Sequence, residues 1–351
     1  MRSRRASVTC VPDRVLTLRE LNRATLARQL LLDRKRLSAK AVIERLVGMQ
    51  AQWPSAPYVG IWTRTTGFRR ASLERELDRG SVVKALVMRQ TLHLVSRRDY
   101  AVLRAALSET VLRVSEQAKL LAPSMRALAD GGPVATATAL EYLEREHGLT
   151  GPTARRAWRG ARVSGHFAHH HETALWRGQP EAVFVALEEP EQHDPTEARA
   201  EMLRRYLAAF GPSTRGDIVA WSKMQVPEIQ RALDGLVLRR FRDEHGRELL
   251  DVPRGLLPSP ETPAPVRFLP KWDNLLLAFA DRTRVLPEEY RKRVIGANGD
   301  VAQTFLVDGF VAGTWRVEDG RIVPEPFERL PGSAQRGLAQ EAERLEAFVA
   351  D

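Results

Sequence analysis

The sequence predicts an α+β fold, mainly helical, built from tandem winged-helix (helix-turn-helix) motifs and ending in a β-rich domain. Apolar residues recur at helical spacing through much of the first 234 residues. Short alternating segments follow successive groups of helices, as a wing follows the helices of a winged helix. Strand-like runs dominate the segment beyond the prolines at 253–265. With 351 residues, of which 43% are hydrophobic, the chain is long enough for two or three domains.

The N-terminal part is expected to hold a tail and the first unit. Residues 1–16 are basic and predict a disordered tail, and residues 17–96 predict a winged helix. Its helices are expected at 18–32, at 38–48 after the cap Ser38, from Ser55, and at 72–79 after the cap Ser72. Two alternating segments, 82–88 and 91–95, predict a hairpin after them.

The middle part is expected to repeat this order twice. Residues 97–198 form a looser copy, with helices at 97–121, 135–147 and 153–162 and extended segments around His166 and 183–187. Residues 199–257 form the clearest copy, with helices at 199–210, at 215–222 after a cap at Ser213 or Thr214, and at 226–235. A hairpin with Gly246 at its tip follows. The third helix and the wing of such a unit are able to contact duplex DNA.

The C-terminal domain is expected over residues 258–351, and its start lies within a proline-rich, linker-like stretch at 253–265. The run Asn274–Ala280 predicts a buried strand. A hairpin turned at Asp308-Gly309 is expected over 304–315, with a further strand at 321–323. A last amphipathic helix is expected at 333–349.

Composition limits the function classes. There are 54 Lys and Arg against 44 Asp and Glu, so a polyanion is a plausible partner, although a surplus made almost entirely of arginine also fits a coding bias. The single cysteine, Cys10, predicts no disulfide and a reducing compartment. No apolar run reaches the roughly 18 residues of a membrane span. We therefore expect a cytoplasmic protein, without membrane attachment and without a cofactor.

Motif searches exclude common enzyme types. The chain has no GxGxxG after a strand, no GxxxxGK[ST], no GxSxG and no HExxH, which argues against nucleotide hydrolysis, Rossmann redox chemistry and common hydrolases. Four histidines lie close together, namely His166, His169, His170 and His171. They predict a solvated loop rather than a metal site, because adjacent positions on an extended segment face opposite ways and no cysteine accompanies them.

The segment Gly48–Pro54 is more informative, because it brings two amides together where a helix stops. Pro54 disfavours helix at Trp53, so the chain is expected to be extended there. In an extended segment Gln50 and Gln52 point to the same face. From spacing alone, a pair of capping or loop glutamines is the ordinary interpretation.

Several motifs in order resemble the AlkZ-type winged-helix DNA glycosylases over nearly the whole chain. They are Gly48-Met-Gln-Ala-Gln-Trp-Pro, Tyr58–Arg64, Met88–Val95, Tyr206–Trp221, Leu269–Arg282 and Phe305–Arg316. The resemblance implies tandem winged helices in a C shape with a C-terminal β domain, and it implies that Gln50 and Gln52 are the catalytic pair. Some relatives remove bulky or crosslinking alkyl adducts, including those of their hosts' own antibiotics. Gln90, Gln303 and Phe310 depart from the family's usual residues, and Phe310 would lie beside a hairpin thought to approach DNA.

The expected activity is that of a monofunctional DNA glycosylase in base excision repair or self-resistance to a genotoxin. Amides do not titrate, so Gln50 and Gln52 are expected to position water and offer carbonyl dipoles to an oxocarbenium-like sugar. That suffices only for a base that leaves without prior protonation, which points to N7- or N3-alkylated purines in duplex DNA. Without an amine beside the motif, we expect no lyase step, and we expect a monomer.

Other side chains are weaker candidates for binding DNA or substrate. Arg89 is expected to neutralise a phosphate, and His93 is expected to be a structural histidine more often than a positioning one. The third wing offers four arginines, for which a solvated hairpin is an equal alternative: Arg239, Arg240, Arg242 and Arg247. Asp273 and Asp281 are expected to cap strand ends or pair with Arg282 and Arg284.

Two other functions remain open from sequence. One is a multi-winged-helix DNA-binding protein or transcriptional regulator without catalysis, and the other is a silent relative that shields damaged DNA. A regulator has no need for paired glutamines, and regulators of this type usually dimerise on palindromes, for which no dimer helix is evident.

Overall fold

The computed structural model describes residues 14–108, 111–178 and 181–351. Most of the expected N-terminal tail, residues 1–13, lies outside the described residues. Its end does not fit the expectation of disorder, because Val15–Leu16 forms strand β1 and pairs in parallel with strand β8 (Arg239–Asp243). Leu16 is buried against Phe241 and Leu249, so an apolar contact fixes this end of the chain to the third unit.

The first unit follows the predicted order with small shifts at its ends. Its elements are α1 (Leu18–Arg28), α2 (Ala39–Arg45), β2 (Met49–Gln50), α3 (Ala56–Trp62), α4 (Arg70–Asp78), β3 (Val82–Leu86), the 3-10 turn η1 (Met88–Gln90) and β4 (Leu92–Ser96). Ser38 caps α2 as predicted, since its hydroxyl accepts from the amide of Ala41. Ser72 caps nothing, because α4 already begins at Arg70.

The second unit contains one more break than predicted. Its elements are α5 (Arg97–Leu107), α6 (Glu116–Ala129), β5 (Val134–Ala135), α7 (Thr136–His147), α8 (Gly151–Ser164), β6 (Phe167–His169), the turn η2 (His171–Ala174) and β7 (Val183–Ala186). The single helix expected at 97–121 is therefore wrong. The cap Ser115, whose hydroxyl accepts from the amide of Ala118, starts a new helix at that point.

The third unit agrees most closely with the prediction. Its elements are α9 (Pro195–Phe210), α10 (Arg215–Ser222), α11 (Val226–Asp234), β8 and β9 (Glu248–Asp251). Thr214 caps α10 in a capping box with Asp217. The hairpin β8–β9 turns at Gly246, whose φ of 76° is the left-handed conformation that favours glycine.

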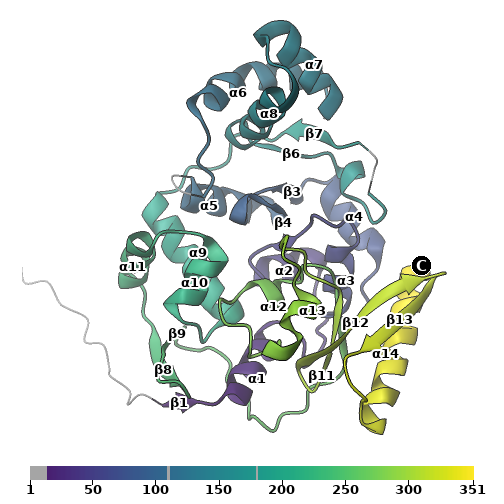
Figure 1. The fold of residues 1–351 in the computed structure, drawn as a ribbon. Coiled ribbons are helices and arrows are strands. Elements are labelled where there is room, and N and C mark those ends of the chain that lie inside the picture. Colours follow the sequence, from purple (N-terminus) through teal and green to yellow (C-terminus); the bar gives the residue numbers. More distant parts are fainter. Residues whose placement is uncertain (1–13, 109–110, 179–180) are drawn as a thin grey trace, which may run out of the picture.

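The first two units share one sheet. Six strands lie in the order β2-β4-β3-β6-β7-β5, and the junction between the units is the antiparallel pairing of Ala85 in β3 with Ala168 in β6. Helices α6, α7 and α8 cover the far end of this sheet, above β6 and β7 in Figure 1. Helix α5 packs along α9, so the second unit also contacts the third. The mainly helical α+β class is confirmed, whereas winged-helix packing of each unit stays a prediction.

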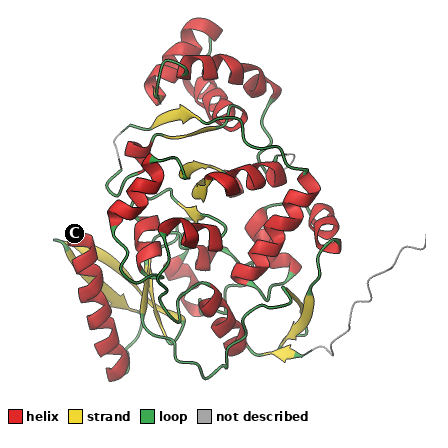
Figure 2. Cartoon of the chain, turned by 180° about the vertical axis from the view of Figure 1, so that it is seen from behind, coloured by secondary structure: helices red, strands yellow, loops and turns green. Residues whose placement is uncertain are grey.

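The C-terminal part contains a four-stranded sheet and a long helix. Its elements are β10 (Arg267–Leu269), α12 (Asn274–Leu277), the turn η3 (Glu288–Tyr290), α13 (Arg291–Val294), β11 (Thr304–Val307), β12 (Phe310–Glu318), β13 (Arg321–Pro326) and α14 (Gly332–Ala350). The buried strand expected at 274–280 is wrong, because Asp273 caps a short helix there and accepts from the amide of Leu275. The strands lie beside α14 on one flank of the molecule (Figure 2).

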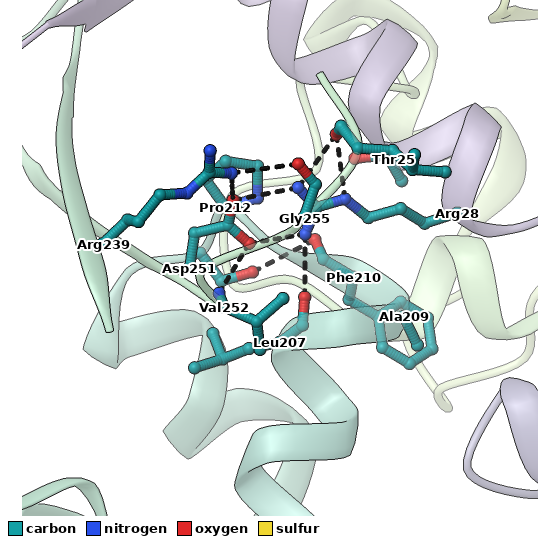
Figure 3. A network of polar contacts seen from close by, with 12 residues as sticks. Thr25, Arg28, Leu207, Ala209, Phe210, Pro212, Arg239, Asp251, Val252 and Gly255 are labelled. Carbon is teal, nitrogen blue, oxygen red and sulfur yellow. Dashed lines mark hydrogen bonds and ion pairs between the residues drawn. The ribbon is translucent and has the colours of Figure 1, made fainter. Parts of the chain in front are cut away.

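A buried ionic network joins α1, the third unit and the proline-rich segment (Figure 3). The carboxylate of Asp251 accepts from Arg28 at 2.6 and 3.0 Å and from Arg239 at 2.7 Å. Arg28 and Asp251 are almost fully buried, so each charge depends on the other for its stability. No described helix is both long and apolar enough to cross a bilayer.

Candidate active site

The two predicted glutamines lie side by side, although only Met49–Gln50 is extended as a strand and the chain bends at Gln52 and Trp53. Gly48, with a φ of 90°, turns the chain out of α2 into the short strand β2, where Gln50 pairs with His93 of β4. The side-chain amide of Gln50 donates to the carbonyl oxygen of Gln52. Gln50 is 7% exposed, whereas Gln52 is exposed, so the pair runs from the protein interior to the surface.

Arg89 holds the inner glutamine in place. Its Nη2 donates to Oε1 of Gln50 at 2.9 Å and contacts Nε2 of His93 at 3.3 Å, and its Nη1 donates to the carbonyl of Trp221. Burial lowers the pKa of Arg89 to about 10, so the side chain still carries its charge at neutral pH. In this structure Arg89 contacts Gln50, and a phosphate contact of Arg89 stays a prediction.

His93 is a buried, neutral histidine. Its Nδ1 lies 2.9 Å from the carbonyl oxygen of Thr91, which identifies Nδ1 as the protonated nitrogen and leaves Nε2 to accept from Arg89. Burial, assisted by the charge of Arg89, lowers the pKa of His93 to about 3. His93 thus reaches the exposed Gln52 only through Arg89 and Gln50, a position that fits the structural interpretation.

Asn274, which the sequence patterns did not single out, fixes the backbone of the motif. Its amide donates to the carbonyl of Gly48 at 2.6 Å, and its carbonyl oxygen accepts weakly from the amide of Gln50 at 3.4 Å. Asn274 and Gln50 are 224 positions apart in the chain. The only signal was that Asn274 belongs to one of the motifs that carry the family resemblance.

An open cavity of about 590 Å³ lies over the paired glutamines, within the size range of small-molecule sites. It is lined by Gln50, Gln52, Arg89, Thr91, Lys271, Trp272, Leu277, Asn298, Gly299 and Asp300. Segments from the first unit and the C-terminal part therefore meet at the motif. Three of these residues carry chemistry that the sequence did not reveal, namely Lys271, Trp272 and Asp300.

The other predicted DNA-binding residues lie elsewhere. In the third wing, Arg239 pairs with Asp251, Arg240 pairs with Glu248, Arg242 donates to the carbonyl of Gly246, and Arg247 pairs with Asp243 and Asp281. Phe310 is half-buried at the start of β12. The preceding turn is fixed to α1, because Asp308 pairs with Arg19 and Arg23.

The histidine cluster is more buried than predicted. Burial lowers the pKa of His169 to about 3, and its ring packs on Phe184 at a centroid distance of 4.5 Å. The expected solvated loop is therefore wrong for His169, because it ends strand β6. Among the described residues, no group of three or more His, Cys, Asp or Glu side chains is placed to hold a metal ion.

The two aspartates of the C-terminal part have structural roles with other partners than predicted. Asp273 forms a buried two-point ion pair with Arg64, at 2.7 and 2.9 Å, in addition to capping α12. Asp281 pairs with Arg247 at 2.8 Å. The expected partner Arg282 instead donates to the carbonyl of Leu276, since α12 places that carbonyl within its reach.

Comparisons with known proteins confirm the family resemblance. A family model described as DNA glycosylase AlkZ-like matches residues 43–348. The "Interstrand DNA cross-link repair glycosylase" of Streptomyces sahachiroi is 28% identical over 346 residues, which cover 88% of this chain and 90% of that protein. The solved structure of Streptomyces sahachiroi DNA glycosylase AlkZ has a TM-score of 0.78 at 22% identity, covers 96% of both chains, and thus shares the fold. Because the family model spans most of the sequence, the chain belongs to the AlkZ-like DNA glycosylase family.

Proposed function

We propose that this chain hydrolyses the N-glycosidic bond of cationic N7- or N3-alkylated purines in duplex DNA, including bulky and crosslinking adducts, and leaves an abasic site. The observation that carries the proposal is the pair of carboxamides, Gln50 and Gln52, hydrogen-bonded to each other at the floor of an open cavity. Family membership supports the reaction type. The name of the S. sahachiroi relative supports crosslinked DNA as a substrate.

The geometry supports water positioning. The carbonyl oxygen of Gln50 accepts one hydrogen bond from Arg89, and that of Gln52 accepts one from Gln50. A carbonyl oxygen has two lone pairs, so each of these oxygens keeps one. The two oxygens are thus able to accept both hydrogens of one water molecule, which directs its own lone pair outward to the anomeric carbon of a bound nucleotide.

The chemistry of an amide defines the substrate. Neither Gln50 nor Gln52 is able to donate a proton to a leaving base or take one from water at the start of the reaction. A purine alkylated at N7 or N3 already carries a positive charge and leaves as a neutral base. The carbonyl dipoles then stabilise the positive charge that develops on the sugar.

Arg89 is a positioning residue in this mechanism. Its positive charge has the wrong sign to stabilise an oxocarbenium-like sugar, so its contribution is to orient the carbonyl of Gln50. His93 supports Arg89 from the other side, since it accepts one of the hydrogens on the same guanidinium nitrogen.

The premise that no amine lies near the motif is wrong, because Lys271 lines the same cavity. Its ammonium group is paired with Asp300 at 2.9 Å. The water held by the paired glutamines is sufficient as the nucleophile, so we still propose hydrolysis without a lyase step. Borohydride should then trap no covalent complex with DNA during turnover.

The test uses duplex DNA with a single N7-methylguanine, in which alkali converts abasic sites to strand breaks. We expect alkali-dependent breaks with the wild-type protein and none with the double variant Gln50→Ala, Gln52→Ala, which should still bind the duplex. Equal rates for wild type and the double variant would refute the catalytic assignment. Tight binding of one DNA sequence without base release would instead support a regulator.

A further inference from the structure

A basic side chain occupies an aromatic and acidic site beside the paired glutamines. The Nζ of Lys271 lies 5.3 Å from the ring centroid of Trp53 and 4.8 Å from that of Trp272. Both distances are within the range of a cation–π contact. The same Nζ lies 2.9 Å from Oδ2 of Asp300, so two rings and a carboxylate surround one positive charge.

The walls of this site are fixed by the backbone around them. Trp272 has a φ of 53°, which is unusual for a bulky residue. Its backbone amide donates to the carbonyl of Val301, and its indole donates to the carbonyl of Gly299. Asp300 is held by a turn in which the amide of Gly296 donates to its carbonyl at 2.8 Å. A strained residue kept by hydrogen bonds indicates a built site.

Two features show that the site has unused binding capacity. The second carboxylate oxygen of Asp300, Oδ1, is buried and has no hydrogen-bond partner among the described residues. The side chain of Trp53 is 49% exposed, although it is large and apolar and directly follows Gln52. A buried acceptor without a donor and an open ring face both favour a flat ligand that carries a positive charge and N–H groups.

We propose that Trp53, Trp272 and Asp300 recognise the charged purine, and that Lys271 fills this site only until the purine arrives. The inference rests on the proposed function, because it takes a cationic alkylpurine as the substrate. Lys271 has a flexible four-carbon stem and is partly exposed, so it is able to swing away. An N7-alkylguanine offers a cationic ring to the tryptophans and N–H groups of its Watson–Crick edge to Asp300.

The positive charge moves from the purine to the sugar during the reaction, so binding of the purine and the chemical step have different electrostatic requirements. As the glycosidic bond breaks, its electron pair moves to the base, so the positive charge leaves the purine and appears on the sugar. A site for the cationic base therefore favours the bound substrate over the transition state, and it strengthens binding without speeding the chemical step. The released base is neutral, so the returning ammonium of Lys271 displaces it from the site.

The experiment compares binding of two matched duplexes that resist cleavage. Both carry a 2′-fluoroarabino sugar at the test position; the base is N7-methylguanine, which is cationic, in one and 7-methyl-7-deazaguanine, which has the same shape and is neutral, in the other. We expect the wild-type protein to bind the cationic probe about tenfold more tightly, as for partly desolvated cation–π contacts. In Asp300→Asn and Trp53→Leu this ratio should fall to about twofold or less.

Two further variants sharpen the test. Lys271→Met should raise the ratio above that of wild type, because the competing charge is gone. Asp33→Asn, which neutralises an exposed carboxylate outside the cavity, should leave the ratio unchanged. An unchanged ratio in both Asp300→Asn and Trp53→Leu, or a lower ratio in Lys271→Met, would overturn the inference. Failure of the wild-type protein to release N7-methylguanine would instead overturn the proposed function.

Discussion

Replacing Arg89 by Met separates a role in orienting the glutamine pair from a role in binding the DNA backbone. Methionine keeps much of the length and the apolar stem of arginine, but it has no donor for Gln50 or for His93. The substitution removes the 2.9 Å hydrogen bond from Nη2 of Arg89 to Oε1 of Gln50. The side-chain amide of Gln50 then lacks the contact with Arg89 that fixes its orientation.

The size of the effect follows from the kind of hydrogen bond. A hydrogen bond that involves a charged group contributes about 1.5–3 kcal/mol. If Gln50 must be oriented in the transition state, removing that contribution corresponds to a decrease of roughly 10- to 150-fold in the rate of base release. Affinity for undamaged duplex should change little, because the side chain of Arg89 is directed to Gln50, His93 and the carbonyl of Trp221.

Two assays on the same protein samples distinguish a role of Arg89 in orienting Gln50 from a role in binding the DNA backbone. Single-turnover release of N7-methylguanine reports the chemical step, and fluorescence anisotropy with undamaged duplex at several salt concentrations reports phosphate contacts. Our reasoning fails if Arg89→Met releases the base at the wild-type rate but binds duplex more weakly, with a salt slope reduced by about one. Arg89→Lys, which keeps the charge but not the planar group, should resemble Arg89→Met in rate.

Three stability predictions concern other buried features. Asp251→Asn should lower the free energy of unfolding in urea by about 3–5 kcal/mol, because it leaves buried guanidinium groups without their carboxylate. Arg240→Gln, in an exposed pair, should lower it by less than about 1 kcal/mol. Equal losses in the two variants would contradict this reasoning. Burial lowers the pKa of Lys84 from 10.5 to about 8, so the unfolded state binds more protons between those values and stability rises with pH there. Lys84→Met should therefore be more stable than wild type at pH 7 by up to about 3 kcal/mol, and the difference in free energy of unfolding should vanish near pH 10.5. A difference that stays constant from pH 7 to 10.5 would refute the lowered pKa of Lys84. Gly309→Ala should destabilise by about 1–3 kcal/mol more than Gly320→Ala, since both have positive φ but only at Gly309 would a new Cβ meet other atoms within 3 Å; equal thermal midpoints would argue against this.

The local part of the site was predictable from the sequence because it depends on neighbours in the chain. An extended segment before Pro54 was expected to place Gln50 and Gln52 on one face, and the two side chains do meet, although only Met49–Gln50 is a strand and the chain bends at Gln52 and Trp53. The same holds for the third unit, where Thr214 as a cap and Gly246 in a turn each determine the backbone nearby. Elements of this kind need no knowledge of the rest of the fold.

The rest of the site depends on contacts between distant segments. Asn274 and Lys271 reach the motif from more than 200 residues away, and no periodicity in the sequence indicates that approach. Asn274–Leu277 was predicted as part of a strand because a short apolar run fits a buried strand and a buried helix equally well. The cap at Asp273 decides for helix, and its pairing with Arg64 is visible only in three dimensions.

The sheet shared by the first two units limits how this protein can be rebuilt. Because β3 pairs with β6 at Ala85 and Ala168, the middle segment cannot be deleted or exchanged as an independent unit. Excising the middle segment would leave the edge of β3 unpaired and open to pairing with another chain, and β3 is the neighbour of β4, with which Gln50 pairs. A chimaera with a related protein would have to carry both halves of the sheet together, and its crossover points belong in the proline-rich segment instead.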